Sequence, residues 1–254
     1  MADSAYVSGS KPAPSASKAG TLPGIVRRHS AVVRVTHWIV TLCFVALLVT
    51  GVEIIISHPR FYWGEEGNVN TKPLFSIPIP SSRSSVPTGY GYVLPDQNGW
   101  SRYLHFQTAW IIVAAGLVYV LYGVSSGHFR TNLLPLRDDL SPRALAREFA
   151  RHLRLKPDTS NQSYNPLQRI TYLIVSFVAF PLVIWTGLAM SPAVTSAFPF
   201  IVNVLGGHQS ARTLHFFDTL FLVLFVAVHI LMVYMAGFRD RMRGMISGRT
   251  KEVL

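Results

Sequence analysis

Four of the nine histidines lie within long apolar stretches of the sequence: His37, His105, His215 and His229. An ionisable side chain in such a stretch is costly to bury, and it usually has a function. A neutral imidazole binds transition metals through a ring nitrogen, and two imidazoles can bind a haem iron from its two faces. For each histidine taken alone, a ligand role and a polar contact between two helices are both open.

The spacing of these histidines arranges them in two pairs. His215 and His229 are 14 residues apart, which on a helix is about 21 Å and about 40° short of four full turns, so both point the same way. His105 begins its apolar stretch from the same side as His215, so these two share a depth. His37 lies at the opposite end of its stretch, at the depth of His229. Two pairs at two depths are what two six-coordinate haems require.

An arginine precedes three of the four histidines by three residues, in Arg34–His37, Arg102–His105 and Arg212–His215. Three residues are almost one helical turn, so each arginine lies on the same helix face as its histidine. A guanidinium makes favourable charge-assisted contacts with a carboxylate, such as a haem propionate. We interpret the three arginines as propionate ligands. The alternative is that each long basic side chain only reaches the headgroups at a helix end.

Four long apolar helices must position these residues. Apolar stretches cover about residues 36–56, 104–124, 170–190 and 213–236, and each is near the roughly 20 residues that an α-helix needs to cross a bilayer. Half of the 254 residues are hydrophobic and 14% are charged, against about 25% charged in a typical soluble domain. The expected fold class is an all-α integral membrane protein, with a four-transmembrane-helix bundle that encloses two haems in the lipid bilayer.

The composition excludes several other classes. The formal net charge is +11, but apolar stretches separate the basic residues, so no nucleic acid is expected as a partner. The single cysteine, Cys43, excludes an internal disulfide and a Cys-ligated iron–sulfur cluster. The absence of a Cys-x-x-Cys-His motif excludes covalently attached c-type haem. Any cofactor is therefore held without thiols.

The distribution of Lys and Arg predicts the orientation in the membrane. Eighteen of them lie before the first apolar stretch, between the second and third, and after the fourth, and five lie in the two other connections. The positive-inside rule places both termini in the cytoplasm of a bacterium, with the chain crossing the inner membrane several times. We expect a disordered cytoplasmic tail at 1–26, a dihaem domain at 27–240 with a long periplasmic loop at 57–102, and a basic cytoplasmic tail at 241–254.

The 57–102 loop is too long to be a mere connection, and it is rich in aromatic side chains. These are Phe61, Tyr62, Trp63, Tyr90, Tyr92 and Trp100. We expect the loop to be the docking surface for a periplasmic oxidoreductase subunit.

The sequence also repeats itself weakly, which is typical of a doubled helical hairpin. The first and third stretches each carry a Thr-Gly pair near the predicted outer end, namely Thr50-Gly51 and Thr186-Gly187. In the repeat, Tyr172 stands where the first stretch has His37, and Tyr119 stands where the last stretch has His229. A second inner haem site is therefore absent from the chain.

Several motifs resemble the bacterial cytochrome b561 and hydrogenase-type b-cytochrome superfamily, which includes the formate dehydrogenase gamma subunits. They are Arg34-x-x-His37-Trp38, His58-Pro59-x-x-Tyr62-Trp63-Gly64, Tyr164-Asn165-Pro166-Leu167-Gln168, Thr186-Gly187-Leu188-Ala189-Met190-Ser191-Pro192, Gly206-Gly207-x-Gln209-Ser210-Ala211-Arg212 and the His215…His229 spacing. The likeness covers about residues 27–250 and looks closest to the thiosulfate-reductase-type cytochrome b subunits. It implies two b-type haems, a quinone site on the cytoplasmic side and association with a molybdopterin-type oxidoreductase.

Asn165 and Gln168 are the candidate quinone-binding residues. They precede the third apolar stretch on the cytoplasmic side and are three residues apart, so both amides could face the same way and donate to quinone carbonyls. A helix cap by Asn165 with Pro166 at the first helical position explains the segment equally well. The resemblance favours quinone, because formate dehydrogenase gamma subunits have a similar Tyr-Asn-x-x-Gln segment at their quinone site.

The expected function is that of a dihaem b-type cytochrome that transfers electrons between the quinone pool and a periplasmic, molybdopterin-type oxidoreductase. The chain would act as a subunit of that complex and not as an enzyme on its own. Two alternatives are a histidine-based metal or proton transporter and a membrane anchor whose histidines only join helices. Zinc sites fit less well, because two ligands at each depth fall short of the usual three or four.

Overall fold

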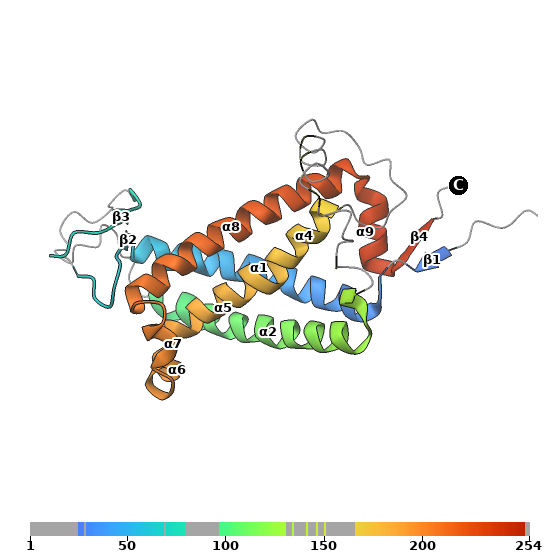
Figure 1. Cartoon of the computed structure of the whole chain (residues 1–254). Coiled ribbons are helices and arrows are strands. Elements are labelled where there is room, and N and C mark those ends of the chain that lie inside the picture. The colour runs from blue at the N-terminus through green and yellow to red at the C-terminus, as the bar shows by residue number, and fades with distance from the viewer. Residues whose placement is uncertain are drawn as a thin grey trace, which may run out of the picture.

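Four long helical segments lie side by side in the computed structural model and form most of the described molecule (Figure 1). The structure describes residues 25–27, 29–68, 70–79, 97–130 and 166–251, with a few single residues between the last two ranges. The segments are α1 (Ala31–Ser57), α2 (Gln97–Ser125), the continuous run of α4 (Pro166–Ile174), η3 (Val175–Ala179) and α5 (Phe180–Ala189), and α8 (His208–Met235). Each segment is long and apolar enough to cross a membrane, which confirms the predicted four-helix fold class.

Each helix begins several residues before its apolar stretch, because the polar residues that precede the stretch are already helical. Ser30 caps α1, and its hydroxyl accepts a hydrogen bond from the backbone N–H of Val33 at 3.3 Å. α2 begins at Gln97, so the connection that we expected to extend over 57–102 is shorter at its far end. Apolar composition alone therefore places the helix starts too late in the chain.

The helices form the doubled hairpin that the internal repeat predicts. α1 packs along α2, and α5 packs along α8. Val175, Ala179 and Leu222 form a buried apolar cluster, and Phe44 of α1 packs against it. This cluster joins the two hairpins near their middle.

The third membrane segment changes its winding just before Pro181. Proline has no N–H to donate to the preceding turn. A turn of π-helix, η3, precedes it, and the backbone N–H of Phe180 bonds to the carbonyl of Val175. A widened turn keeps the segment continuous where a regular hydrogen bond is lost.

We name the two ends of the bundle after their histidines. The His105 end is where α1 ends and α2 begins, and the His37 end is where α1 begins. At the His105 end, β2 (Arg60–Phe61) pairs antiparallel with β3 (Phe75–Ser76), and the short helices α6 (Pro192–Ala197) and α7 (Phe200–Asn203) connect α5 to α8 (Figure 1). Within the described residues, this pair of strands and a second pair at the His37 end accompany the helices.

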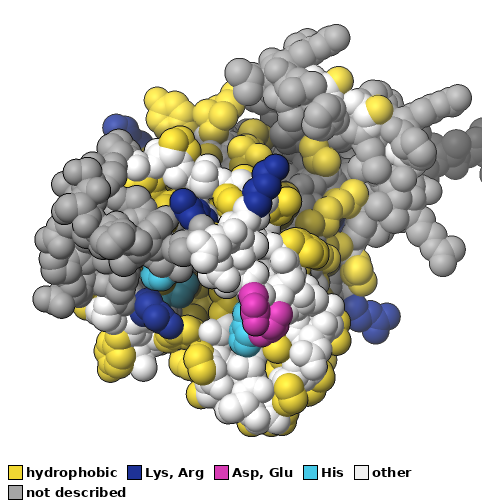
Figure 2. Space-filling view, turned by 90° about the vertical axis from the view of Figure 1, so that its left-hand side faces the viewer, with side chains coloured by type: hydrophobic (Ala, Val, Ile, Leu, Met, Phe, Trp, Pro, Cys, Tyr) yellow, Lys and Arg dark blue, Asp and Glu magenta, His cyan; other side chains and the backbone are white. Residues whose placement is uncertain are grey.

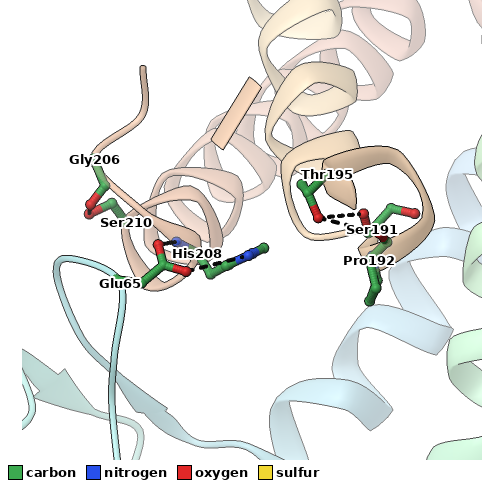
Figure 3. A network of polar contacts seen from close by, with 7 residues as sticks. All are labelled: Glu65, Ser191, Pro192, Thr195, Gly206, His208 and Ser210. Carbon is green, nitrogen blue, oxygen red and sulfur yellow. Dashed lines mark hydrogen bonds and ion pairs between the residues drawn. The ribbon is translucent and has the colours of Figure 1, made fainter. Parts of the chain in front are cut away.

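The segment that follows α1 is bound to the first turns of α8. The backbone N–H of His208 donates to the Glu65 carboxylate at 3.0 Å, and the His208 Nε2 lies 3.4 Å from its other oxygen (Figure 3). The Thr213 hydroxyl donates to the carbonyl of Tyr62 at 2.7 Å, and the hydroxyl of Ser210 accepts from the backbone N–H of Gly64 at 2.8 Å. These contacts fix the loop over the end of the bundle.

Only part of the aromatic loop is available to a partner. Phe61 is 1% exposed and Tyr62 is buried beside it, and the Phe61 ring lies 4.5 Å from the ring of Phe216. Trp63 is 60% exposed and Trp100 is 48% exposed. Tyr90 and Tyr92 lie outside the described residues. Phe61 and Tyr62 are therefore not available to a partner, and their burial stabilises the loop itself. That the loop is a docking surface stays a prediction.

At the His37 end, α9 (Phe238–Ser247) folds back toward the start of α1, and β1 (Ile25–Arg27) pairs antiparallel with β4 (Arg249–Lys251) (Figure 1). The Trp38 indole N–H donates to the carbonyl of Met245 at 3.2 Å, which holds α9 against α1. Secondary structure thus begins within the segment 1–26 and continues into the segment 241–254, which we expected to be tails.

A side chain at Gly207 would clash with the loop that follows α1. It has φ +113°, and an added Cβ would lie 2.6 Å from the backbone of Gly64 and of Glu65. We expect Gly207→Ala to lower the free energy of unfolding by about 3 kcal/mol, because backbone strain and overpacking add. Thermal unfolding of the detergent-solubilised protein measures this.

The matched control is Gly237→Ala, because Gly237 also has a positive φ, +93°, but nothing lies within 4 Å of an added Cβ. Only backbone strain of about 1 kcal/mol is expected there. Equal losses in the two variants would show that the contact between Gly207 and the loop does not exist.

Candidate functional site

The four membrane histidines face one another in two pairs, one at each end of the bundle. The ring centres of His105 on α2 and His215 on α8 are 6.3 Å apart. The ring centres of His37 on α1 and His229 on α8 are 6.4 Å apart. These are the pairs that the helical spacing predicts.

Both separations fit two imidazoles that bind one metal ion from opposite sides. A bond from a metal to an imidazole nitrogen is about 2 Å long, and the ring centre lies about 1 Å further, so the two centres are about 6 Å apart. Within the described part of the chain, no group of three or more His, Cys, Asp or Glu side chains comes together. Each pair thus supplies two ligands, which suits a haem, because the porphyrin supplies the other four donor atoms.

A buried threonine contacts each ring at the His105 end. The hydroxyl of Thr50 on α1 lies 2.9 Å from Nδ1 of His105, and the hydroxyl of Thr186 on α5 lies 3.0 Å from Nδ1 of His215. The sequence analysis found these threonines only as members of the repeat and gave them no role. Each threonine has the same position in the helix that precedes its histidine. This equivalence is the signal in the sequence that could have identified them as contacts of the histidines.

The pair at the His37 end has aromatic neighbours instead. His229 stacks on Phe225 with ring centres 5.8 Å apart, and Tyr172 meets His229 at 6.5 Å and a steep angle. Trp38 lies edge-on to His37 at 5.4 Å. Tyr172 therefore lies beside the histidine pair, although in the repeat it occupies the position of His37.

The side chain of Arg212, on α8, contacts the loop that follows α1. Its Nη1 donates to the carbonyl of Arg60 at 3.0 Å, its Nη2 donates to the carbonyl of His58, and its guanidinium lies 4.7 Å from the ring centre of Phe61. Part of its donor capacity is thus used by the protein itself. A residue expected only to bind a propionate also holds the loop in place.

Positive charge gathers around His58 at the same end. Burial lowers the pKa of His58, the nearby guanidinium of Arg212 lowers it further, a hydrogen bond with the backbone of Ile54 raises it, and Arg102 adds a smaller lowering effect. The end-on view in Figure 2 shows histidine, Lys and Arg side chains on this face. Such surroundings favour an anionic group such as a carboxylate. The sequence analysis named His58 only as part of a motif and gave it no role.

Arg34 is held at the His37 end by α9. Its Nη1 donates to the carbonyl of Ile246 at 2.7 Å. It lies one turn before His37 on α1, as the sequence predicts. This hydrogen bond holds α9 at the start of α1.

The candidate quinone residues are only partly within the described structure. Gln168 is half-buried on α4, one turn before Tyr172, whose ring meets His229. Asn165 lies outside the described residues.

Comparison with known proteins gives the family. Residues 28–248 match the family model described as prokaryotic cytochrome b561. A protein of Azospira oryzae named as a protein-methionine-sulfoxide reductase subunit, YedZ1, is 30% identical over 211 residues, which cover 81% of this chain and 89% of the relative. A protein of Cupriavidus necator named as the B-type cytochrome subunit of a Ni/Fe hydrogenase is 24% identical over 214 residues, which cover 80% of this chain and 76% of the relative.

The family match includes all four membrane histidines and both hairpins. It confirms the superfamily that the sequence motifs indicate, while the particular likeness to thiosulfate-reductase-type subunits stays a prediction. From the match over residues 28–248 together with the four membrane-spanning helices, the chain belongs to the prokaryotic cytochrome b561 family of multi-pass, b-type haem proteins.

Proposed function

We propose that this chain is a dihaem cytochrome b subunit that carries electrons across the membrane, with one haem bound by His105 and His215 and the other by His37 and His229. The observation that carries the proposal is the spacing of the rings, 6.3 Å in one pair and 6.4 Å in the other. Neither pair has a free third ligand among the described side chains, which disfavours a zinc site. The family binds b-type haem, which supplies one-electron chemistry when bound.

α8 supplies one ligand to each pair, and this sets the distance between the two sites. His215 and His229 are 14 residues apart, about 21 Å along the helix axis. One site therefore lies toward each surface of the membrane. Two haems at these places would carry electrons from one surface of the membrane to the other.

The arginines belong to the proposal as propionate ligands. Arg102 and Arg212 serve the site at the His105 end, where His58 adds to the same polar cluster. Arg34 serves the site at the His37 end. Arg212 would keep its hydrogen bonds to the loop while it binds a propionate. The loop and the haem would then share this one side chain.

The proposed membrane is the bacterial inner membrane, with the His37 end in the cytoplasm and the His105 end in the periplasm. The distribution of basic residues supports this orientation. The exposed side chains of Arg239, Arg241 and Arg243 on α9 lie at the His37 end, as the orientation requires.

The proposed partner is an oxidoreductase subunit, of molybdopterin type, that docks at the His105 end. The two relatives are named as subunits of a reductase and of a hydrogenase, which supports an oxidoreductase partner. At this end, Trp63, Leu74 and Trp100 are exposed and are available for such a contact. The loop that carries Trp63 also contacts Arg212, so the docking surface lies next to the proposed site.

The proposed second electron carrier is a quinone, bound at the His37 end by Gln168 and Asn165. Gln168 supports this because Tyr172, one turn further along α4, contacts the ring of His229. An amide at this place can donate to a quinone carbonyl close to the second haem.

Alanine substitution of single histidines tests the pairing. His105→Ala or His215→Ala should remove one haem and leave the other, because each substitution removes one of two axial ligands. His37→Ala or His229→Ala should remove the other haem. Each variant should keep about half of the haem, measured by the reduced-minus-oxidised spectrum after resolving the two components by redox titration.

His208→Ala is the matched control, because His208 lies on the same helix but pairs with Glu65. It should keep both haems. If His37→Ala and His105→Ala abolished the same spectral component, the pairing would be wrong.

The quinone site is tested with the double variant Asn165→Ala and Gln168→Ala. Both haems should stay spectrally normal, while their re-oxidation by a quinone analogue slows about tenfold, as expected for the loss of hydrogen bonds worth about 1.4 kcal/mol. Gln107→Ala, at an exposed glutamine of α2 near the other end, is the control and should not change the rate. Unchanged quinone kinetics in the double variant would place the site elsewhere.

A further inference from the structure

Thr50 and Thr186 make the same set of contacts in the two hairpins. The Thr50 hydroxyl lies 2.8 Å from the carbonyl of Ala46 and 3.2 Å from that of Leu47, one turn earlier in α1. The Thr186 hydroxyl lies 2.8 Å from the carbonyl of Leu182 and 3.1 Å from that of Val183 in α5. Each hydroxyl also faces Nδ1 of the histidine on the following long helix.

This geometry determines which ring nitrogen carries the proton. A hydroxyl has one proton, and a carbonyl can only accept, so each threonine donates to its own helix and accepts from the histidine. The ring of His105 also has a hydrogen bond with the backbone of Leu47, and the ring of His215 has one with the backbone of Val183. The threonine oxygen that faces Nδ1 is an acceptor in both hairpins. Nδ1 must carry the proton, and Nε2 is left with a free lone pair.

The glycine after each threonine borders the same ring. A Cβ added at Gly51 would lie 3.6 Å from Cε1 of His105, and one added at Gly187 would lie 3.6 Å from Cε1 of His215. At His215 the next nearest atom is Nδ1, at 3.9 Å, so this glycine lies beside the edge of the ring that carries Nδ1. In each hairpin the Thr-Gly pair thus contacts one edge of the ring.

We propose that Thr50 and Thr186 are positioning residues for the haem at the His105 end, where they fix Nε2 of both histidines toward the iron and lower the reduction potential of that haem. The inference rests on the proposed dihaem function. A hydrogen bond from Nδ1–H makes an imidazole a stronger electron donor, and stronger donation stabilises the oxidised iron. Both histidines carry this bond, so their effects on the potential of a haem bound between them would act in the same direction.

The pair at the His37 end is built differently. Nδ1 of His37 is buried and has no hydrogen-bond partner among the described residues. Besides His37, the rings of Phe225 and Tyr172 lie against His229. The effect of the two threonines is therefore confined to one of the two sites.

The test replaces each hydroxyl by a methyl group and follows the two reduction potentials. Thr50→Val, Thr186→Val and the double variant should keep both haems, because the backbone carbonyls still hold the rings. The potential of the haem at the His105 end should rise in each single variant and rise further in the double variant. The potential of the other haem should not change. A spectroelectrochemical titration of the purified holoprotein measures both potentials.

Two further variants separate hydrogen bonding from packing. Thr50→Ser and Thr186→Ser keep the hydroxyl and should restore the original potential. Thr171→Val is the matched control, because Thr171 on α4 makes the same bond to its own helix, 2.8 Å to the carbonyl of Leu167, and should leave both potentials unchanged.

The outcomes distinguish this inference from the function on which it rests. If the unmodified protein holds no haem, the proposed function fails. If it holds two haems and the double valine variant leaves both potentials unchanged, only the role of the threonines is overturned. Equal shifts of both haems, or a loss of the haem that serine does not prevent, would also overturn it.

Discussion

An imidazole inside a membrane helix is costly to bury when a ring nitrogen has no partner, because no water is present to satisfy that nitrogen. At the His105 end, Nδ1 of each ring is matched by a threonine of the neighbouring helix, and the two ring centres lie 6.3 Å apart. This requirement explains why α1 must pack against α2 and α5 against α8. The histidines also join the two hairpins. His105 of α2 and His37 of α1 pair with histidines near opposite ends of α8.

α8 is the element on which both sites depend. It carries one histidine of each pair on a single face, and its first turns bind the loop that follows α1. Arg212 belongs to both arrangements, because it precedes His215 by one turn and bonds to the carbonyls of His58 and Arg60. A change in the loop would therefore reach Arg212 and the haem proposed at that end. A partner that docks on the loop would be placed close to its electron donor or acceptor.

The sequence predicted the helices and the histidine pairs because both follow from the geometry of one helix at a time. An apolar run indicates a membrane span, and a separation of 14 residues indicates that two side chains lie on the same face of a helix. The roles of Thr50, Thr186 and His58 depend on contacts between helices far apart in the sequence, which no local pattern gives. The burial of Phe61 and Tyr62 was missed for the same reason, since it depends on how the loop folds over α8. The position of α9 depends on its contact with Trp38.

The central claim is that each histidine pair binds one b-type haem, and the stoichiometry of haem to protein tests it most directly. The pyridine haemochromogen spectrum gives the amount and type of haem in the purified chain, and quantitative amino-acid analysis gives the amount of protein. We expect two b-type haems for each chain, released by acidic acetone because neither is covalently attached. One haem or none in the fully loaded protein would contradict the account.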